Sequence, residues 1–157
     1  MDGDIKNVFI SHVHEDDDGL AKLKDLVERG GLTIRDSSIN STNPNDANHP
    51  DYIKAEYLAP QIRWASTLLV YITPKTKDSE WVNWEIEYAE KQGKRIVGVY
   101  AHGANECDIP EALEKYADDV RGWNSDGVVE AILGETNEWH NPSGELRDPR
   151  PIPRYGC

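Results

Sequence analysis

Glu85 is the residue of this chain whose type and position are most indicative of chemistry. Residues 79–91 have helical spacing, begin with a serine suited to cap a helix, and follow an apolar stretch that ends at Thr73. At about 100° per residue, Glu85 projects between Trp81 and Val82 on the apolar side of this helix. A carboxylate among aromatic side chains is desolvated, so we expect a raised pKa and a partner that is positively charged or carries hydroxyl groups. On spacing alone, the carboxylate could equally reach water with its stem on the core.

A second candidate cluster lies at residues 12–17, which read HVHEDD and follow a short apolar stretch. It nearly matches the HxHxDH motif of metallo-β-lactamase-like hydrolases, but Asp17 stands where the motif has its last histidine. A dinuclear site also needs further ligands downstream, and the three other histidines lie in no matching context. We therefore expect no metal, and interpret these residues as a loop that contacts ligand or solvent.

The elements that would position these residues alternate along the chain. Short β-branched and apolar runs predict strands at 8–10, 32–35, 66–73, 95–100 and, as a weak edge strand, 120–123. Helical spacing predicts helices at 20–27, 51–58, 79–91, 109–116 and 126–133. This alternation predicts an α/β, flavodoxin-like fold: a parallel sheet of about five strands in the order 2-1-3-4-5, with helices on both faces. Ligands are then expected at the carboxyl ends of the strands, of which 66–73 should be central.

Length and composition are typical of one globular domain. A chain of 157 residues with 38% hydrophobic content can bury roughly two thirds of its unfolded surface in a single core. We assign residues 1–134 to this domain. Residues 135–157 are rich in proline and predict an extended tail, either a disordered end or an arm that packs on the domain or docks a partner. Residues 37–50 predict a long loop of the kind that often binds ligands.

Charge and cysteine content bear on partners and location. The formal charge of −12 repels phosphate backbones and anionic lipids, so neither nucleic acid nor a membrane is an expected partner. A small anionic ligand remains compatible, because helix N-termini can bind phosphate locally. Cys107 and Cys157 form no disulfide framework, and no apolar run approaches the roughly 20 residues of a membrane span. We therefore expect a cytoplasmic protein.

Common nucleotide and phosphate motifs of this fold are missing from the sequence. It contains neither GxGxxG after the first strand nor GxxxxGK[ST], which argues against dinucleotide redox chemistry and P-loop chemistry. Thr73-Pro74 stands where a phosphoacceptor receiver would have its aspartate. These functions are therefore not expected.

Three blocks of the sequence occur in a characteristic order. They are VFISH at 8–12 with the following Glu15-Asp16, Asp36 after a predicted strand, and Ser79, Trp81 and Glu85 after the central predicted strand. Over roughly residues 5–134, the chain thereby resembles TIR domains, with Asp36 in the place of the second-strand aspartate and Ser79, Trp81 and Glu85 as the TIR serine, tryptophan and catalytic glutamate. Within this superfamily, the small acidic chain resembles the bacterial TIR effectors of Thoeris-type antiphage defence. His12, His14, residues 37–50 and the proline-rich tail depart from the usual TIR pattern.

The resemblance implies an NAD+ nucleosidase or ADP-ribosyl cyclase that makes an ADP-ribose-derived signal in antiviral defence. NAD+ would be its substrate and no cofactor is expected. The resemblance also implies self-assembly through TIR–TIR contacts, and a downstream effector reached by a diffusible product. Glu85 would be catalytic, and the implied substrate-binding residues are Ser11, His12, Val13, Asp36, Ser37, Ser79 and Trp81.

This chemistry fits a buried carboxylate. Nicotinamide is a cationic leaving group, so its departure needs no general acid and depends chiefly on a carboxylate that stabilises the developing ribosyl cation. Water would then give ADP-ribose, a nucleophile of the ligand itself a cyclic product, and a foreign nucleophile an exchange product. The alternative is a non-catalytic TIR interaction module, in which Glu85 is an edge residue and residues 37–50 are an assembly contact.

Overall fold

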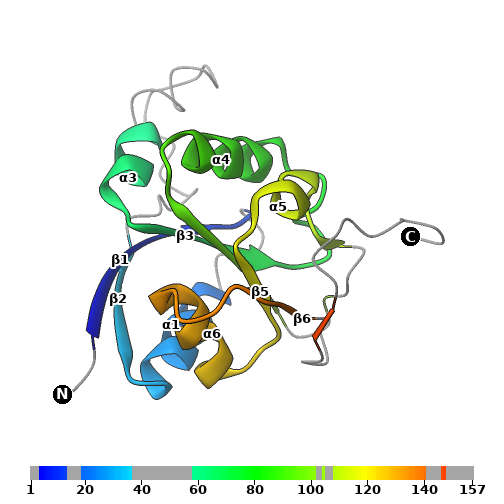
Figure 1. The fold of residues 1–157 in the computed structure, drawn as a ribbon. Helices are drawn as coiled ribbons and strands as arrows, with labels where there is room; N and C mark the ends of the chain where they lie inside the picture. The colour runs from blue at the N-terminus through cyan, green and yellow to red at the C-terminus, as the bar shows by residue number, and fades with distance from the viewer. Residues whose placement is uncertain are drawn as a thin grey trace.

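The computed structural model describes residues 4–13, 19–36, 58–101, 104, 108–140 and 146–147, which form an α/β fold around one sheet (Figure 1). The strands are β1 (Asp4–Ser11), β2 (Leu32–Asp36), β3 (Thr67–Ile72), β4 (Arg95–Tyr100), β5 (Asp119–Arg121), β6 (Trp139–His140) and β7 (Leu146–Arg147). The helices are α1 (Leu20–Arg29), α3 (Ala59–Trp64), α4 (Glu80–Lys91), α5 (Glu111–Tyr116) and α6 (Ser125–Leu133). None of these helices is long and apolar enough to cross a lipid bilayer.

The sheet has the order β2-β1-β3-β4-β5-β6-β7. Strands β1 to β5 are mutually parallel, which confirms the predicted fold class and the order 2-1-3-4-5. Every residue of β3 is buried, as expected for a central strand covered on both faces. The prediction of an edge strand at 120–123 is wrong, because β6 pairs with β5 in parallel and β7 pairs with β6 in antiparallel orientation.

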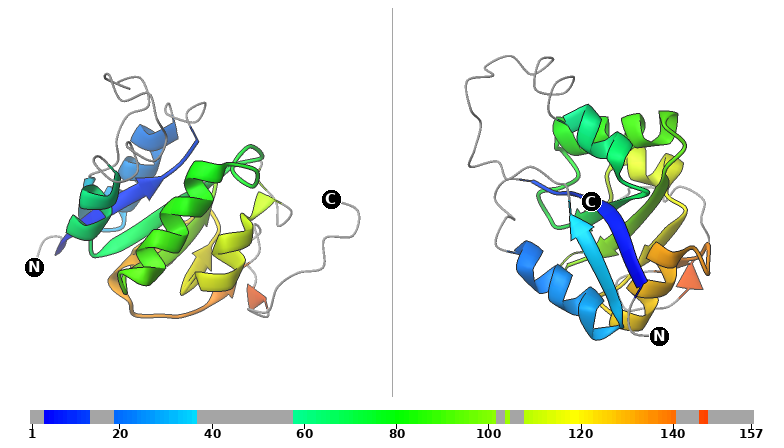
Figure 2. Two further views of the ribbon diagram at one scale, coloured as in Figure 1. Left: turned by 90° about the horizontal axis from the view of Figure 1, so that it is seen from above. Right: turned by 90° about the vertical axis from the view of Figure 1, so that its left-hand side faces the viewer.

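Two helical layers cover the sheet (Figure 1 and Figure 2). Helices α3, α4 and α5 lie on one face, where Ile62, Ile86 and Leu113 join the core. Helices α1 and α6 lie on the other face and bury a second apolar cluster that includes Leu23 and Val128. The side chains alternate between the two faces along each strand, so one sheet serves both clusters. Glu85 therefore belongs to the layer made by α3, α4 and α5.

The helix predicted at 51–58 and the loop predicted at 37–50 lie outside the described residues, except for Leu58. Helix α3 begins directly after Leu58, and Pro60 lies in its first turn. A proline is well tolerated there, because the first N–H groups of a helix have no partner within the helix.

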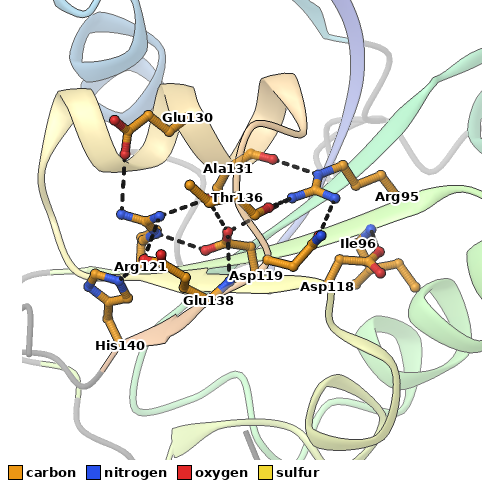
Figure 3. Close-up of polar contacts among 11 residues, drawn as sticks. Arg95, Ile96, Asp118, Asp119, Arg121, Glu130, Ala131, Thr136, Glu138 and His140 are labelled. Atoms are coloured by element: carbon orange, nitrogen blue, oxygen red, sulfur yellow. Dashed lines mark hydrogen bonds and ion pairs between the residues drawn. The ribbon is translucent and has the colours of Figure 1, made fainter. Parts of the chain in front are cut away.

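A buried polar network attaches the first residues of the predicted tail to the sheet (Figure 3). The carboxylate of Asp119 accepts hydrogen bonds from Nε of Arg121 at 2.8 Å, Oγ1 of Thr136 at 2.5 Å and the backbone N–H of Glu138 at 3.1 Å. Trp139 follows and is only 4% exposed. The domain boundary at residue 134 stays a prediction, but residues 135–140 and strand β7 of the predicted tail belong to the packed structure.

Candidate active site

Glu85 lies on the side of α4 that faces the sheet and is only 7% exposed. Its helix neighbours Val82, Ile86 and Ala89 are fully buried. The structure therefore places the carboxyl group in the interior rather than at the wet edge of the helix. Burial raises the pKa of Glu85 to about 8, and the hydrogen bond from Ser11 offsets part of this rise.

The partner of this carboxyl group is a hydroxyl group from a distant part of the chain. Oγ of Ser11 donates a hydrogen bond to Oε1 of Glu85 at 2.5 Å. Ser11 is the last residue of β1 and pairs with Val70 of β3, so the contact lies toward the carboxyl ends of these two strands. This is the edge at which parallel sheets of this class bind their ligands.

Ser79 and Trp81 lie at the start of α4. Oγ of Ser79 accepts a hydrogen bond from the backbone N–H of Val82 at 3.1 Å, so this serine caps the helix as its sequence position predicts. Trp81 lies about one helical turn before Glu85. Its half-buried side chain packs against the core cluster beneath α4. Contacts of these two residues with a substrate stay predictions.

His12 and Val13 follow β1 directly. Nδ1–H of His12 donates a hydrogen bond to the backbone carbonyl of Ile10 at 3.1 Å, which requires the proton on Nδ1. Val13 is buried in the same apolar cluster as Ile86. The backbone after Ser11 is thereby held near the Ser11–Glu85 contact.

The backbone of Asp36 lies away from the Ser11–Glu85 pair. Asp36 ends β2 at the level of Val8, three residues before Ser11 on the neighbouring strand. Three residues along a strand correspond to roughly 10 Å. The side chain of Asp36 and the whole of Ser37 lie outside the described residues, so their binding roles stay predictions.

The candidate metal motif is only partly described, because residues 14–17 lie outside the described part of the chain. Among the described residues, no three His, Cys, Asp or Glu side chains form a group that could hold a metal ion.

Two residues that position α4 were missed by the sequence analysis. Oγ1 of Thr76 accepts a hydrogen bond from the backbone N–H of Thr73 at 2.8 Å and donates one to the carbonyl of Tyr71 at 3.1 Å. Oδ1 of Asn83 accepts one from the backbone N–H of Ala112 at 3.0 Å, at the start of α5. The sequence does carry a signal for the role of Thr76. Thr73 and Thr76 form a TxxT pair directly after a buried strand, and threonine hydroxyls often bond to the backbone in such turns.

Several solved structures are similar in fold. The CMP N-glycosidase BcmB of Clostridium botulinum is 17% identical, with 83% of this chain and 99% of that chain covered at a TM-score of 0.48. The TIR domain of the Toll-related receptor TRR-2 of Hydra magnipapillata is 18% identical, with coverages of 70% and 81% and a TM-score of 0.47. A 2-desoxiribosyltransferase of Leishmania mexicana is 15% identical, with coverages of 97% and 87% and a TM-score of 0.44.

Sequence comparison assigns the family. None of the curated proteins matches the chain. The family described as "Thoeris protein ThsB, TIR-like domain" matches residues 9–106, which is more than half of the chain and includes the Ser11–Glu85 contact, Ser79 and Trp81. The protein therefore belongs to the family of TIR-like domains of the Thoeris protein ThsB.

Proposed function

We propose that this protein cleaves the nicotinamide glycosidic bond of NAD+ and produces an ADP-ribose-derived signalling nucleotide, cyclic or conjugated, in antiphage immunity. The observation that carries the proposal is the buried carboxyl group of Glu85, held by the hydroxyl of Ser11 toward the carboxyl end of the sheet. A carboxyl group is costly to bury, and perturbed pKa values concentrate at functional sites. Membership of the ThsB family supports the setting in antiphage defence.

The reaction needs little from the protein beyond a well-placed negative charge. When the bond between C1′ of the ribose and N1 of nicotinamide breaks, its electron pair stays with the ring, which leaves as neutral nicotinamide. C1′ becomes the centre of a ribosyl cation. The carboxylate of Glu85 would stabilise this cation until a nucleophile forms a new bond to C1′ and releases its own proton.

The electrostatics around Glu85 would suit a cationic ligand. With a pKa of about 8, Glu85 is largely protonated in the empty protein at neutral pH. The positive charge of the nicotinamide ring would favour the ionised carboxylate, so we expect NAD+ binding to release a proton. Burial strengthens the attraction, because the interior screens charges less than water does. Trp81, about one turn away on α4, would offer an aromatic surface to the ligand and exclude water.

The decisive experiment measures nicotinamide release from NAD+ by the full chain, over a range of protein concentrations that includes assembled states. We expect Glu85→Gln to lower kcat/KM by at least about 100-fold, or ~2.7 kcal/mol of transition-state stabilisation. Glu87→Gln is the matched control, because Glu87 is an exposed glutamate on the same helix. Mass spectrometry of the nucleotide product would distinguish ADP-ribose from a cyclic or conjugated product.

Three outcomes would contradict the proposal. Equal rates with the parent protein and Glu85→Gln would remove Glu85 from the reaction, and absence of turnover in every state would favour the non-catalytic interaction module. Turnover that is lost on chelation and kept in Glu85→Gln would favour a metal-dependent reaction at residues 12–17.

A further inference from the structure

We propose that Ser11 is a positioning residue that orients the carboxyl group of Glu85 and favours its ionised form, rather than a residue that touches the substrate. The inference rests on the proposed function, because it assigns a task within the same site. The resemblance to TIR domains implied instead that Ser11 binds the substrate.

Relative accessibility decides between these two roles. Ser11 has no exposed surface, whereas Glu85 keeps 7% of its surface exposed. In the structure Ser11 thus offers a ligand no surface, whereas Glu85 offers a small one. The backbone of Ser11 is also held in the sheet, because it pairs with Val70 of the central strand β3.

The hydrogen-bond arrangement leaves part of the carboxyl group for a ligand. Ser11 bonds to Oε1 of Glu85, and no described residue bonds to Oε2. A hydroxyl hydrogen bond to a single oxygen fixes the rotation of the carboxyl plane. It also stabilises the ionised form, because a carboxylate is the stronger acceptor.

No charged side chain of the described structure is a cause of the shift in the pKa of Glu85. Burial and the hydrogen bond from Ser11 are the causes that shift the pKa of Glu85, the first upward and the second downward. The titratable groups with described side chains on the elements packed against α4 are not among these causes. They are Lys6 of β1, His12 after it, Arg63 of α3, Tyr71 of β3, Arg95 and Tyr100 of β4, and Glu111, Glu114, Lys115 and Tyr116 of α5. Arg63 bonds to the hydroxyl of Tyr88, and Arg95 bonds to the carbonyl of Ala131 in α6. Ser11 is thus the group that opposes the effect of burial.

Positioning of Glu85 and direct contact with the substrate predict different pH profiles of kcat/KM for Ser11→Ala. The value of kcat/KM follows the ionised fraction of Glu85 in the free enzyme. Loss of a hydrogen bond to a charged group should raise the pKa of Glu85 by about one pH unit. Ser11→Ala should therefore lose about 10-fold in kcat/KM at pH 7, and the loss should disappear well above both pKa values. Removal of a direct substrate contact would instead lower kcat/KM by the same factor at every pH.

The first test needs no substrate. The full chain, labelled with ¹³C at the glutamate carboxyl groups, is titrated by NMR, and the Glu85 signal is assigned by its absence in Glu85→Gln. We expect Ser11→Ala to raise the pKa of Glu85 and Ser11→Thr, which keeps the hydroxyl, to restore it. Ser66→Ala is the matched control, because the hydroxyl of Ser66 donates to the carbonyl of Asn7 at 3.1 Å, away from Glu85. An unchanged pKa in Ser11→Ala would overturn the inference.

The second test is the pH profile of kcat/KM for nicotinamide release by the parent protein, Ser11→Ala, Ser11→Thr and Ser66→Ala. A loss in Ser11→Ala that shrinks as pH rises supports the inference, and a loss that is constant with pH overturns it. If the NMR titration moves as expected while no protein releases nicotinamide, the coupling of Ser11 to Glu85 stands and the proposed function fails.

Discussion

Ser11 and Glu85 lie 74 residues apart in the chain, and a hydrogen bond of 2.5 Å joins their side chains in the interior of the domain. The bond stabilises the ionised carboxylate, but burial opposes ionisation more strongly, so the net effect is a raised pKa. The same carboxyl group therefore links the proposed chemistry to the stability of the fold.

The stability of the protein should depend on pH through Glu85. Burial raises its pKa from 4.5 to about 8, so between these values the folded protein holds a proton that the unfolded chain has released. This contribution is complete below about pH 4.5 and is lost as pH rises through 8. Glu85→Gln has no proton to lose, so it should become more stable than the parent as pH rises, by up to about 1.4 kcal/mol per pH unit.

Urea unfolding of the parent and Glu85→Gln from pH 5 to pH 8 measures this difference. Glu87→Gln makes the same chemical change at an exposed position of α4 and should not reproduce the pH dependence. A difference between the parent and Glu85→Gln that stays flat across this range would show that Glu85 is not protonated in the folded protein.

Substrate binding should depend on Trp81. An aromatic contact beyond simple burial is worth about 0.5–1.5 kcal/mol, so Trp81→Ala should weaken NAD+ binding by roughly 3- to 10-fold, and Trp81→Phe should retain much of it. Trp84→Ala is the control, because Trp84 is also half-buried on α4 but stacks on Tyr88 at 5.2 Å between ring centroids. Isothermal titration with Glu85→Gln as the common background separates binding from turnover. Equal losses in the two tryptophan variants would remove the specific role of Trp81.

Arg121 should be essential for stability, because it compensates a buried charge. Asp119 has no exposed surface, and Nε of Arg121 lies 2.8 Å from its carboxylate. Removal of one partner of a buried pair typically costs about 3–5 kcal/mol, and we expect a loss of this order in Arg121→Met. Arg29→Met should lose less than about 1 kcal/mol, because the pair of Arg29 with Asp25 is exposed.

Denaturant unfolding measures both arginine variants. Amide hydrogen exchange would add a local readout, because the backbone N–H of Glu138 donates to Asp119. If Arg121→Met unfolds at the same urea concentration as Arg29→Met, the network does not stabilise the domain.

Thr76 should stabilise the turn that leads into α4. Its hydroxyl is fully buried and bonds to the backbone of Thr73 and Tyr71. Thr76→Val keeps the shape and removes the hydroxyl, so the buried hydrogen bonds to the N–H of Thr73 and the carbonyl of Tyr71 are lost and we expect a loss of about 1–3 kcal/mol. Thr76→Ser keeps the hydroxyl and should retain most of the stability. Thermal unfolding of the two variants is the measurement, and a more stable Thr76→Val than Thr76→Ser would contradict this role.

Local sequence patterns predict much of the fold and one partner, Glu85, of the Ser11–Glu85 contact. The strands β1 to β5 were predictable because a parallel sheet covered on both faces needs short apolar runs, and right-handed connections restrict their order. The inward position of Glu85 was predictable because helical periodicity alone places it between Trp81 and Val82. The cap at Ser79 was predictable because a serine before a helix can accept a bond from a free N–H group.

Other features depend on contacts that no local pattern encodes. Trp139 is an isolated apolar residue in a proline-rich stretch, so its burial beside β5 depends on the space that the sheet leaves open. The pairing of Arg121 with Asp119 reads in the sequence as an ordinary polar stretch, because burial is a property of the assembled layers.

The sequence by itself determined the order of the elements and the helix face on which Glu85 lies, because both depend on periodicity within a few residues. Only the tertiary structure decided that Ser11 is the partner of Glu85. The strand order brings the end of β1 beneath α4, and a contact across 74 residues exists only once the sheet and its helical layer have assembled.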